Sequence, residues 1–117
     1  MNTSELRLGN LVWNQYSGVM IVDLISLSHC YLSKGHGMPS GYFEDKFIEP
    51  ISLTWNWLER ANFIKFNEEQ FGHQGLCTLE ITDAGFLTDN GIVLKYVHQL
   101  QNLFFAMNEV ELEIKDK

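Results

Sequence analysis

The side chains that could do chemistry are few in this chain, and their spacing forms no known catalytic set. Histidines and cysteines are spread along the 117 residues at His29, Cys30, His36, His73, Cys77 and His98. Structural zinc sites use closely spaced Cys and His pairs, and zinc proteases carry HExxH. Neither pattern occurs here, and GxSxG, GxGxxG and the P-loop sequence are missing as well. The sequence therefore predicts no metal site, no cofactor and no enzymatic activity.

One glycine-rich segment could still bind a ligand. Residues 34–46 read KGHGMPSGYFEDK and show no apolar period, and long loops of compact domains often carry function. Lys34 and His36 could donate to phosphate oxygens, glycine N–H groups could approach an anion, and aromatic rings could stack on a base. The alternative is a solvated connection whose aromatic residues fold back onto the core. The predicted site for a small anionic ligand comprises Tyr31, Lys34, His36, Tyr42 and Trp55.

Charge and composition narrow the possible partners. The net charge is -7, with 8 Lys+Arg against 15 Asp+Glu, and the cations are scattered singly. A nucleic-acid surface concentrates Lys and Arg, so nucleic acid is an unfavoured partner. No apolar run approaches the ~20 residues of a membrane span, and the first residues show no signal-peptide pattern. We expect a single domain over 1–117, located in the cytoplasm, with two free cysteine thiols.

The clearest periodicity in the chain lies at Tyr96–Asn108. Its apolar residues recur at helical spacing and predict an amphipathic helix whose inward face is Tyr96, Val97, Leu100, Leu103, Phe104 and Met107. His98, Gln101, Asn102 and Glu109 take the opposite face, and Phe105 lies among them. A lone aromatic residue among polar ones suits a homo-oligomer interface, which we predict at Gln101, Asn102 and Phe105. The alternative is a helix buried on both sides within one monomer.

The remaining patterns predict an α+β fold. Apolar alternation and turn residues place three N-terminal strands at Leu6–Asn14, Val19–Leu27 and His29–Ser33. These form an antiparallel β-meander, alone or as part of a small SH3-like barrel. A central short helix is expected at Leu53–Ala61, with Thr54 as a good N-cap. Further β-strands and the C-terminal amphipathic helix follow. Those strands are expected at Phe47–Ile51, Asn62–Phe66, Leu76–Thr82 and Ile92–Leu94, with an acidic turn at Asn67–Gly75, a hairpin turn at Asp89–Gly91 and a further helical turn in Glu109–Lys117.

Three stretches carry a resemblance that covers most of the chain: LRLGNLVWN, EPISLTWNWLERANF and YVHQLQNLFFAM. Together they resemble a family of small uncharacterised proteins from bacteria and their phages. Its members share an R-[IL]-G-N-x-V opening, a PI-x-LT-x-x-WL middle and a HQLQNL[YF]FAL helix. The chain departs from that family's ending from Met107 to Leu112, and Trp55 and Asn56 replace its usual acidic pair. The resemblance implies a phage or prophage accessory protein, with Trp57 in the core and Trp55 more exposed.

A second, shorter resemblance points to a different function. The helix Leu53–Ala61 followed by a strand and CTLEITDAGF resembles the end of a winged-helix domain, which implies DNA binding. It covers only a third of the chain, and a basic recognition helix is missing. The favoured interpretation is a non-catalytic, oligomeric binding protein that sequesters a small nucleotide-derived immune signal. The alternatives are a protein-interaction module that blocks a host protein and a winged-helix-like DNA-binding regulator.

Overall fold

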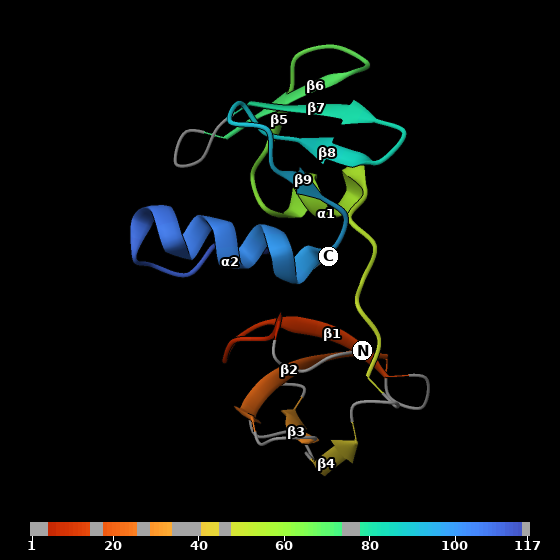
Figure 1. The fold of residues 1–117 in the computed structure, drawn as a ribbon, viewed down its shortest axis with the longest axis vertical. Helices are drawn as coiled ribbons and strands as arrows, with labels where there is room; N and C mark the ends of the chain where they lie inside the picture. Colours follow the sequence, from red (N-terminus) through yellow and green to blue (C-terminus); the bar gives the residue numbers. More distant parts are fainter. Residues whose placement is uncertain are drawn as a thin grey trace. The chain divides into compact units, whose positions relative to one another are not determined.

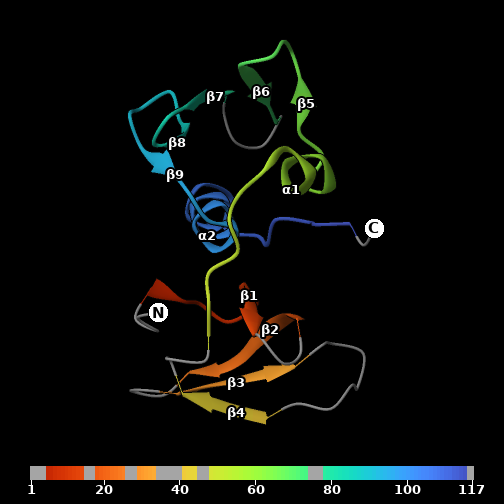
Figure 2. The same cartoon turned by 90° about the vertical axis from the view of Figure 1, so that its right-hand side faces the viewer.

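The computed structural model describes residues 5–14, 18–25, 29–33, 41–44, 48–73 and 78–115. The chain divides into two compact units, Met1–Ile51 (unit 1) and Ser52–Lys117 (unit 2), each with its own antiparallel sheet (Figures 1 and 2). This arrangement of strands and helices confirms the predicted α+β class. The grouping of both units into one domain stays a prediction. No helix among the described residues is long and apolar enough to cross a membrane.

Unit 1 is a four-stranded antiparallel meander within the described ranges, which confirms the predicted N-terminal meander. The strand order is β1-β2-β3-β4, with β1 at Leu11–Asn14, β2 at Gly18–Ile25, β3 at His29–Ser33 and β4 at Gly41–Glu44. Strand β4 corrects the prediction of an irregular segment over residues 34–46. It is only four residues long, so its pairing with β3 rather than a visible apolar period defines it. The SH3-like barrel stays a prediction.

The RLGN opening forms a tight turn before β1. Gly9 adopts a φ of 90°, a conformation that glycine reaches without a side-chain clash. The buried side chain of Asn10 accepts a hydrogen bond from the Arg7 backbone N–H at 2.6 Å. Beyond β4, the predicted strand Phe47–Ile51 is represented in the described residues by a single bridge, in which Glu49 pairs with Trp13 of β1. The core of this unit comprises Leu6, Val12, Met20, Val22, Leu32 and Ile48.

In the described part of unit 2, a five-stranded antiparallel sheet lies between two helices along the sequence. The helices are α1, Trp55–Arg60, and α2, Val97–Asn108. The strand order is β5-β6-β7-β8-β9, with β5 at Ile64–Lys65, β6 at Gln70–Gly72, β7 at Thr78–Thr82, β8 at Gly85–Leu87 and β9 at Val93–Leu94. Strand β6 falls inside the predicted acidic turn, which was therefore too long. The predicted hairpin at Asp89–Gly91 is confirmed, since it joins β8 to β9 and Gly91 has a φ of 87°.

One face of this sheet carries the core of unit 2. Phe71 and Leu79 are register partners on that face, as are Phe86 and Leu94, and all four are buried. The Phe71 and Phe86 rings meet edge to face at 5.6 Å. Both helices lie on the same side of the sheet in Figures 1 and 2. They add buried side chains at Leu58, Val97, Leu100 and Phe104, and Ala61 directly after α1 is also buried.

Helix α2 confirms the strongest prediction in its position but not in every face assignment. Met107, predicted to face inward, is exposed, whereas His98 and Gln101, predicted to face solvent, are buried. The helix ends at Glu109, whose left-handed backbone (φ 59°) donates its N–H to the Phe105 carbonyl at 2.8 Å. Residues 109–115 are therefore not an extra helical turn, which corrects that prediction. Helical spacing predicts in which direction each side chain of α2 points, but it does not predict how far the core extends along the helix.

Candidate functional site

The predicted ligand-binding residues are distributed over both units. Tyr31 and Tyr42 are register partners in the β3–β4 ladder, so the backbone places these two tyrosines opposite each other. Lys34 and His36 lie outside the described residues. Trp55 begins α1 in unit 2. Of the five residues, the structure therefore brings Tyr31 and Tyr42 together.

The tryptophans of α1 do not divide into one core and one exposed residue. Both are half-buried, and the fully buried side chain of α1 is Leu58. The Trp55 ring stacks on the core residue Phe71, with centroids 5.2 Å apart and planes at 26°. The Trp57 ring is covered by Arg60, whose guanidinium carbon lies 4.2 Å from its centroid. The prediction of Trp57 as the core residue is wrong, because Trp55 is about 60° from Leu58 around the helix and Trp57 about 100°.

The predicted oligomer interface on α2 is only partly at the surface. Gln101 is buried, Asn102 is half-buried, and Phe105 is 37% exposed. Gln101 therefore cannot present a contact surface in this conformation, which corrects that assignment. Phe105 keeps the exposure that its place among polar residues predicted.

Exposed apolar side chains occur near the C-terminal end of α2. Phe105, Met107 (53% exposed) and Val110 (57% exposed) fall within six residues, and we call this segment the helix tip. Phe105 and Met107 are about 200° apart around the helix axis, so they point to different sides of α2. The chain turns back here (Figure 1). Two hydrogen bonds define the turn: Asn108 Nδ2 donates to the Phe104 carbonyl at 3.1 Å, and the Glu109 N–H donates to the Phe105 carbonyl. Exposed acidic residues follow directly at Glu109, Glu111 and Glu113.

The tail after the helix tip is fixed to the rest of unit 2. Leu112 is buried, which anchors the middle of the tail. Further along, the Lys115 N–H donates to the Arg60 carbonyl at 2.7 Å, and Arg60 Nε donates to the Lys115 carbonyl at 2.7 Å. The apolar side chains of the helix tip therefore stand on a segment that is held at both ends.

A second exposed apolar surface lies on the outer face of the sheet. Ile64 is 62% exposed and Phe66 is 60% exposed, more than the other large hydrophobic residues whose side chains are described. They are two positions apart at an edge of the sheet and so share one face. The end of the Phe66 ring lies over Gly72, where a Cβ atom would be only 2.6 Å from Cε2 and Cζ. We call Ile64, Phe66, Gly72 and Glu80 the sheet platform.

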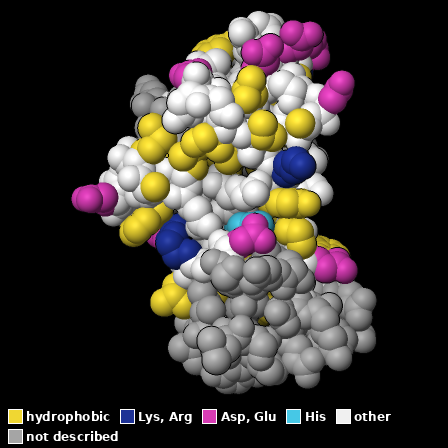
Figure 3. Space-filling view, viewed as in Figure 1, with side chains coloured by type: hydrophobic (Ala, Val, Ile, Leu, Met, Phe, Trp, Pro, Cys, Tyr) yellow, Lys and Arg dark blue, Asp and Glu magenta, His cyan; other side chains and the backbone are white. Residues whose placement is uncertain are grey.

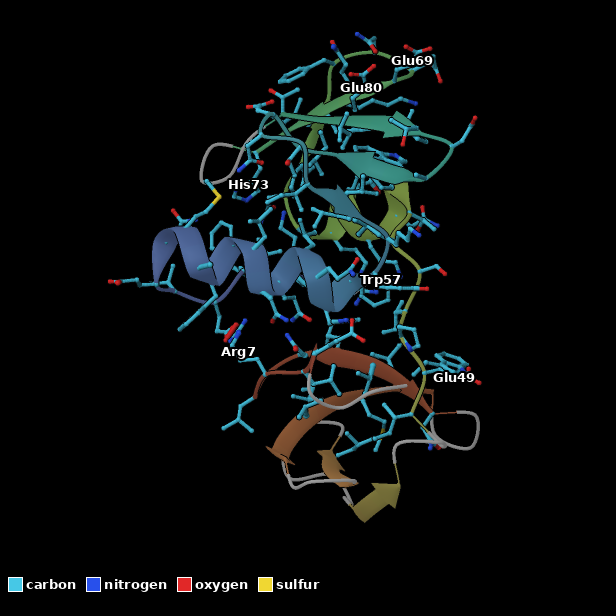
Figure 4. All side chains as sticks on the ribbon, in the orientation of Figure 1. Arg7, Glu49, Trp57, Glu69, His73 and Glu80 are labelled. Atoms are coloured by element: carbon cyan, nitrogen blue, oxygen red, sulfur yellow. The ribbon has the colours of Figure 1, made fainter. Side chains whose placement is uncertain are left out.

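The charges beside the sheet platform are mainly acidic. Glu80 is exposed and is the register partner of Gln70, so both lie on the outer face. Figure 4 shows Glu80 on β7 and Glu69 just before β6, and the Glu69 carbonyl accepts the Ile81 N–H at 2.8 Å. Lys65 is the nearby cation, and its Nζ lies 3.3 Å from Glu68 Oε2. Acidic and apolar side chains adjoin in this region of unit 2 (Figure 3).

The sequence signal for the sheet platform was present but incomplete. Alternation in Asn62–Phe66 predicted a strand with Ile64 and Phe66 on one face, yet it did not say which face is buried. Phe63, on the other face, proved to be the core residue. The contact with Gly72 depends on the β5–β6 register, and β6 lies within the segment predicted as a turn.

His73 occupies an aromatic environment between the sheet and α2 (Figure 4). Its ring lies 5.0 Å from Phe63 and 5.4 Å from Phe104 between centroids. Burial lowers the pKa of His73 below its usual 6.5, and a hydrogen bond with the Ala61 backbone acts in the opposite direction. The imidazole is therefore mostly neutral at pH 7. Within the described ranges, no three His, Cys, Asp or Glu side chains gather to hold a metal ion.

Comparison with known proteins adds no relative: no family model matches the chain, and no curated protein or solved structure matches it. The resemblance to a phage and bacterial family stays a prediction.

Proposed function

We propose that this chain is a non-catalytic protein-interaction module that binds a macromolecular partner through the helix tip. The observation that carries this proposal is the exposure of Phe105, Met107 and Val110 on a segment fixed by Leu112 and by Arg60. Fully burying one such side chain is worth about 1.5–3 kcal/mol, so a partner that wraps around the end of the helix gains from covering each of them. An aromatic residue with a preformed backbone is a frequent hot spot.

The charge next to the helix tip favours a basic partner over a second copy of the chain. Exposed carboxylates at Glu109, Glu111 and Glu113 border the apolar residues, and the whole chain carries a net charge of -7. Two identical tips would bring like charges together, which opposes association, whereas a basic surface would be attracted. The partner proposed here therefore combines apolar and basic side chains, as a host protein blocked by a phage accessory protein could.

The experiment compares affinity-purified complexes from the chain's native cell for three versions of the protein. A Phe105→Ser, Met107→Ser double variant removes the apolar centre, and Ile92→Ser removes an exposed apolar residue in the β8–β9 connection. We expect one stoichiometric, basic partner with the wild type and with Ile92→Ser. Calorimetry with that purified partner should show a loss of at least about 30-fold for the double variant, which corresponds to ~2 kcal/mol.

Folding and salt controls make the result decisive. Each variant must retain the wild-type amide NMR pattern away from its substituted residues. Binding through an acidic border should also weaken as ionic strength rises. Equal affinity of the double variant and the wild type would contradict the proposal, as would a partner whose binding surface is acidic.

Capture of a nucleotide-derived signal is a second candidate, favoured by one observation in unit 1. The β3–β4 register pairs Tyr31 with Tyr42, two of the residues expected to stack on a base. Calorimetry with cyclic dinucleotides tests it, and the expected result is micromolar binding that a Lys34→Ala, His36→Ala variant weakens. Heat changes no larger than those of dilution would remove this candidate.

A further inference from the structure

We propose that the sheet platform is a second binding surface, which accepts an extended peptide segment carrying an arginine close to an apolar side chain. This inference goes beyond the proposed function, because it concerns another face of unit 2 and does not depend on the helix tip. It rests on the register of β5, β6 and β7, on the contact between Phe66 and Gly72, and on the charge of the outer face.

The ladder places the members of the sheet platform on one face. Ile64 is the register partner of Gly72, and the Phe66 N–H donates to the Gln70 carbonyl at 2.9 Å. Gln70 in turn pairs with Glu80. Directly opposite residues of an antiparallel ladder point to the same side of a sheet. Ile64, Phe66 and Glu80 therefore face the same solvent layer.

Gly72 determines how the Phe66 ring is presented. The ring leans diagonally across the sheet and occupies the space of the missing Gly72 side chain, so Gly72 itself is buried although it lies on the outer face. An aromatic ring held against the backbone in this way loses mobility but keeps a large exposed area. Such a surface suits an aliphatic side chain or a planar guanidinium, which stacks on aromatic rings better than an ammonium does.

The charge pattern selects a cationic occupant. Glu80 is an exposed carboxylate within the platform, while Lys65 is already 3.3 Å from Glu68. An arginine fork can bind a carboxylate with two hydrogen bonds. A second copy of this chain would bring further carboxylates to the same place, so a basic segment of another protein is the favoured occupant.

Strand spacing sets the separation of the two contacts. Phe66 and Glu80 are two strands apart, roughly 10 Å at the usual distance between neighbouring strands. A segment crossing the strands in a polyproline-like conformation places residues i and i+3 on one side about 9 Å apart. The matching segment therefore has an apolar residue followed three positions later by an arginine.

The test is an NMR titration of the full chain with a blocked hexapeptide, Gly-Leu-Ser-Ser-Arg-Gly. We expect amide shift changes centred on Phe66, Gly72 and Glu80, with a dissociation constant on the order of 1 mM. A matched peptide with citrulline in place of arginine keeps the shape and removes the charge. It should bind about twofold to fivefold more weakly, since the arginine loses an exposed ion pair with Glu80 and such pairs contribute a small amount.

Two variants separate the ring from the charge. Gly72→Ala forces the end of the Phe66 ring away while leaving Phe66 in place, and should weaken the arginine peptide by a similar factor. Glu80→Gln should remove most of the preference for arginine over citrulline. A Met107→Ser variant at the helix tip should bind the peptide as the wild type does. The test of the sheet platform is therefore independent of the test of the proposed function.

Three results would overturn the inference. One is an absence of shift changes at the platform at about 10 mM peptide, ten times the expected dissociation constant. The others are equal binding of the arginine and citrulline peptides, and equal binding by the wild type and Gly72→Ala when both proteins have the same fold.

Discussion

Removing the Arg60 side chain should release the C-terminal tail without unfolding the sheet. One side-chain contact of Arg60 reaches the tail: Nε donates to the Lys115 carbonyl at 2.7 Å. The packing of the guanidinium over Trp57 lies within α1 and persists when the tail opens. A net hydrogen bond is worth about 0.5–1.5 kcal/mol, so Arg60→Ala should lower the free energy of tail opening by that amount.

Native-state hydrogen exchange measures this opening at a single amide. The Lys115 N–H donates to the Arg60 backbone carbonyl, so the substitution keeps that carbonyl and alters only the stability of the contact. Exchange at Lys115 should accelerate by about 2-fold to 12-fold, which is the same free energy expressed as a ratio. Amides in β7 and β8 should keep their wild-type rates.

Two matched variants test the reasoning. Arg60→Lys keeps the charge but lacks the planar fork, and should give an intermediate rate. Lys65→Ala removes another partly exposed cation, whose recorded partner is Glu68, and should leave Lys115 unchanged. If Arg60→Ala changes the Lys115 rate by less than about twofold, burial of Leu112 alone holds the tail. The Arg60 contacts would then have no energetic role.

Three further predictions concern stability. His73 has a lowered pKa, so its stabilising contribution is complete above pH 6.5 and is lost as the pH falls towards its folded-state pKa. The free energy of urea unfolding, measured between pH 7.5 and 5.5, should therefore depend less on pH in His73→Gln than in the wild type. An identical pH dependence would refute this. Leu79→Ala should lower the free energy of unfolding by about 2–5 kcal/mol in chemical denaturation, because Leu79 is fully buried. Ile81→Ala, at an exposed position of the same strand, should lower it by less than about 1 kcal/mol. Equal losses would contradict that ranking. Gly85→Ala should lower the melting temperature more than Gly91→Ala does. Both glycines have positive φ, but only a Cβ atom added at Gly85 would meet backbone, at 2.8 Å from the Leu94 carbonyl oxygen. The reverse order of melting temperatures would contradict this prediction.

The long periodic helix was predictable from the sequence, and some of the short strands were not. Helix α2 repeats its apolar pattern over three turns, and its bounds differ from the prediction by one residue at the start. Strands β4 and β6 contain four and three residues, so their apolar alternation cannot be distinguished from a loop. Their neighbours in the sheet define them through backbone pairing, and that information is distant in sequence.

The candidate surfaces were predictable only where one residue conflicted with its surroundings. Phe105 stood among polar residues and proved exposed. Gln101 looked equally suitable for the surface, but helical spacing cannot reveal that a polar side chain is covered by the fold. The Phe66–Gly72 contact required the register of β5 and β6, which no local pattern supplies.

The empty position at Gly72 has a consequence for how this protein can change over generations. The Phe66 ring occupies the volume that any larger residue at position 72 would need. A change at one position should therefore be tolerated mainly alongside a change at the other, with a small residue at 66 accompanying a side chain at 72. In descendants of this sequence, we expect the two positions to be inherited as a pair, and a library randomised at both should return them in coupled combinations.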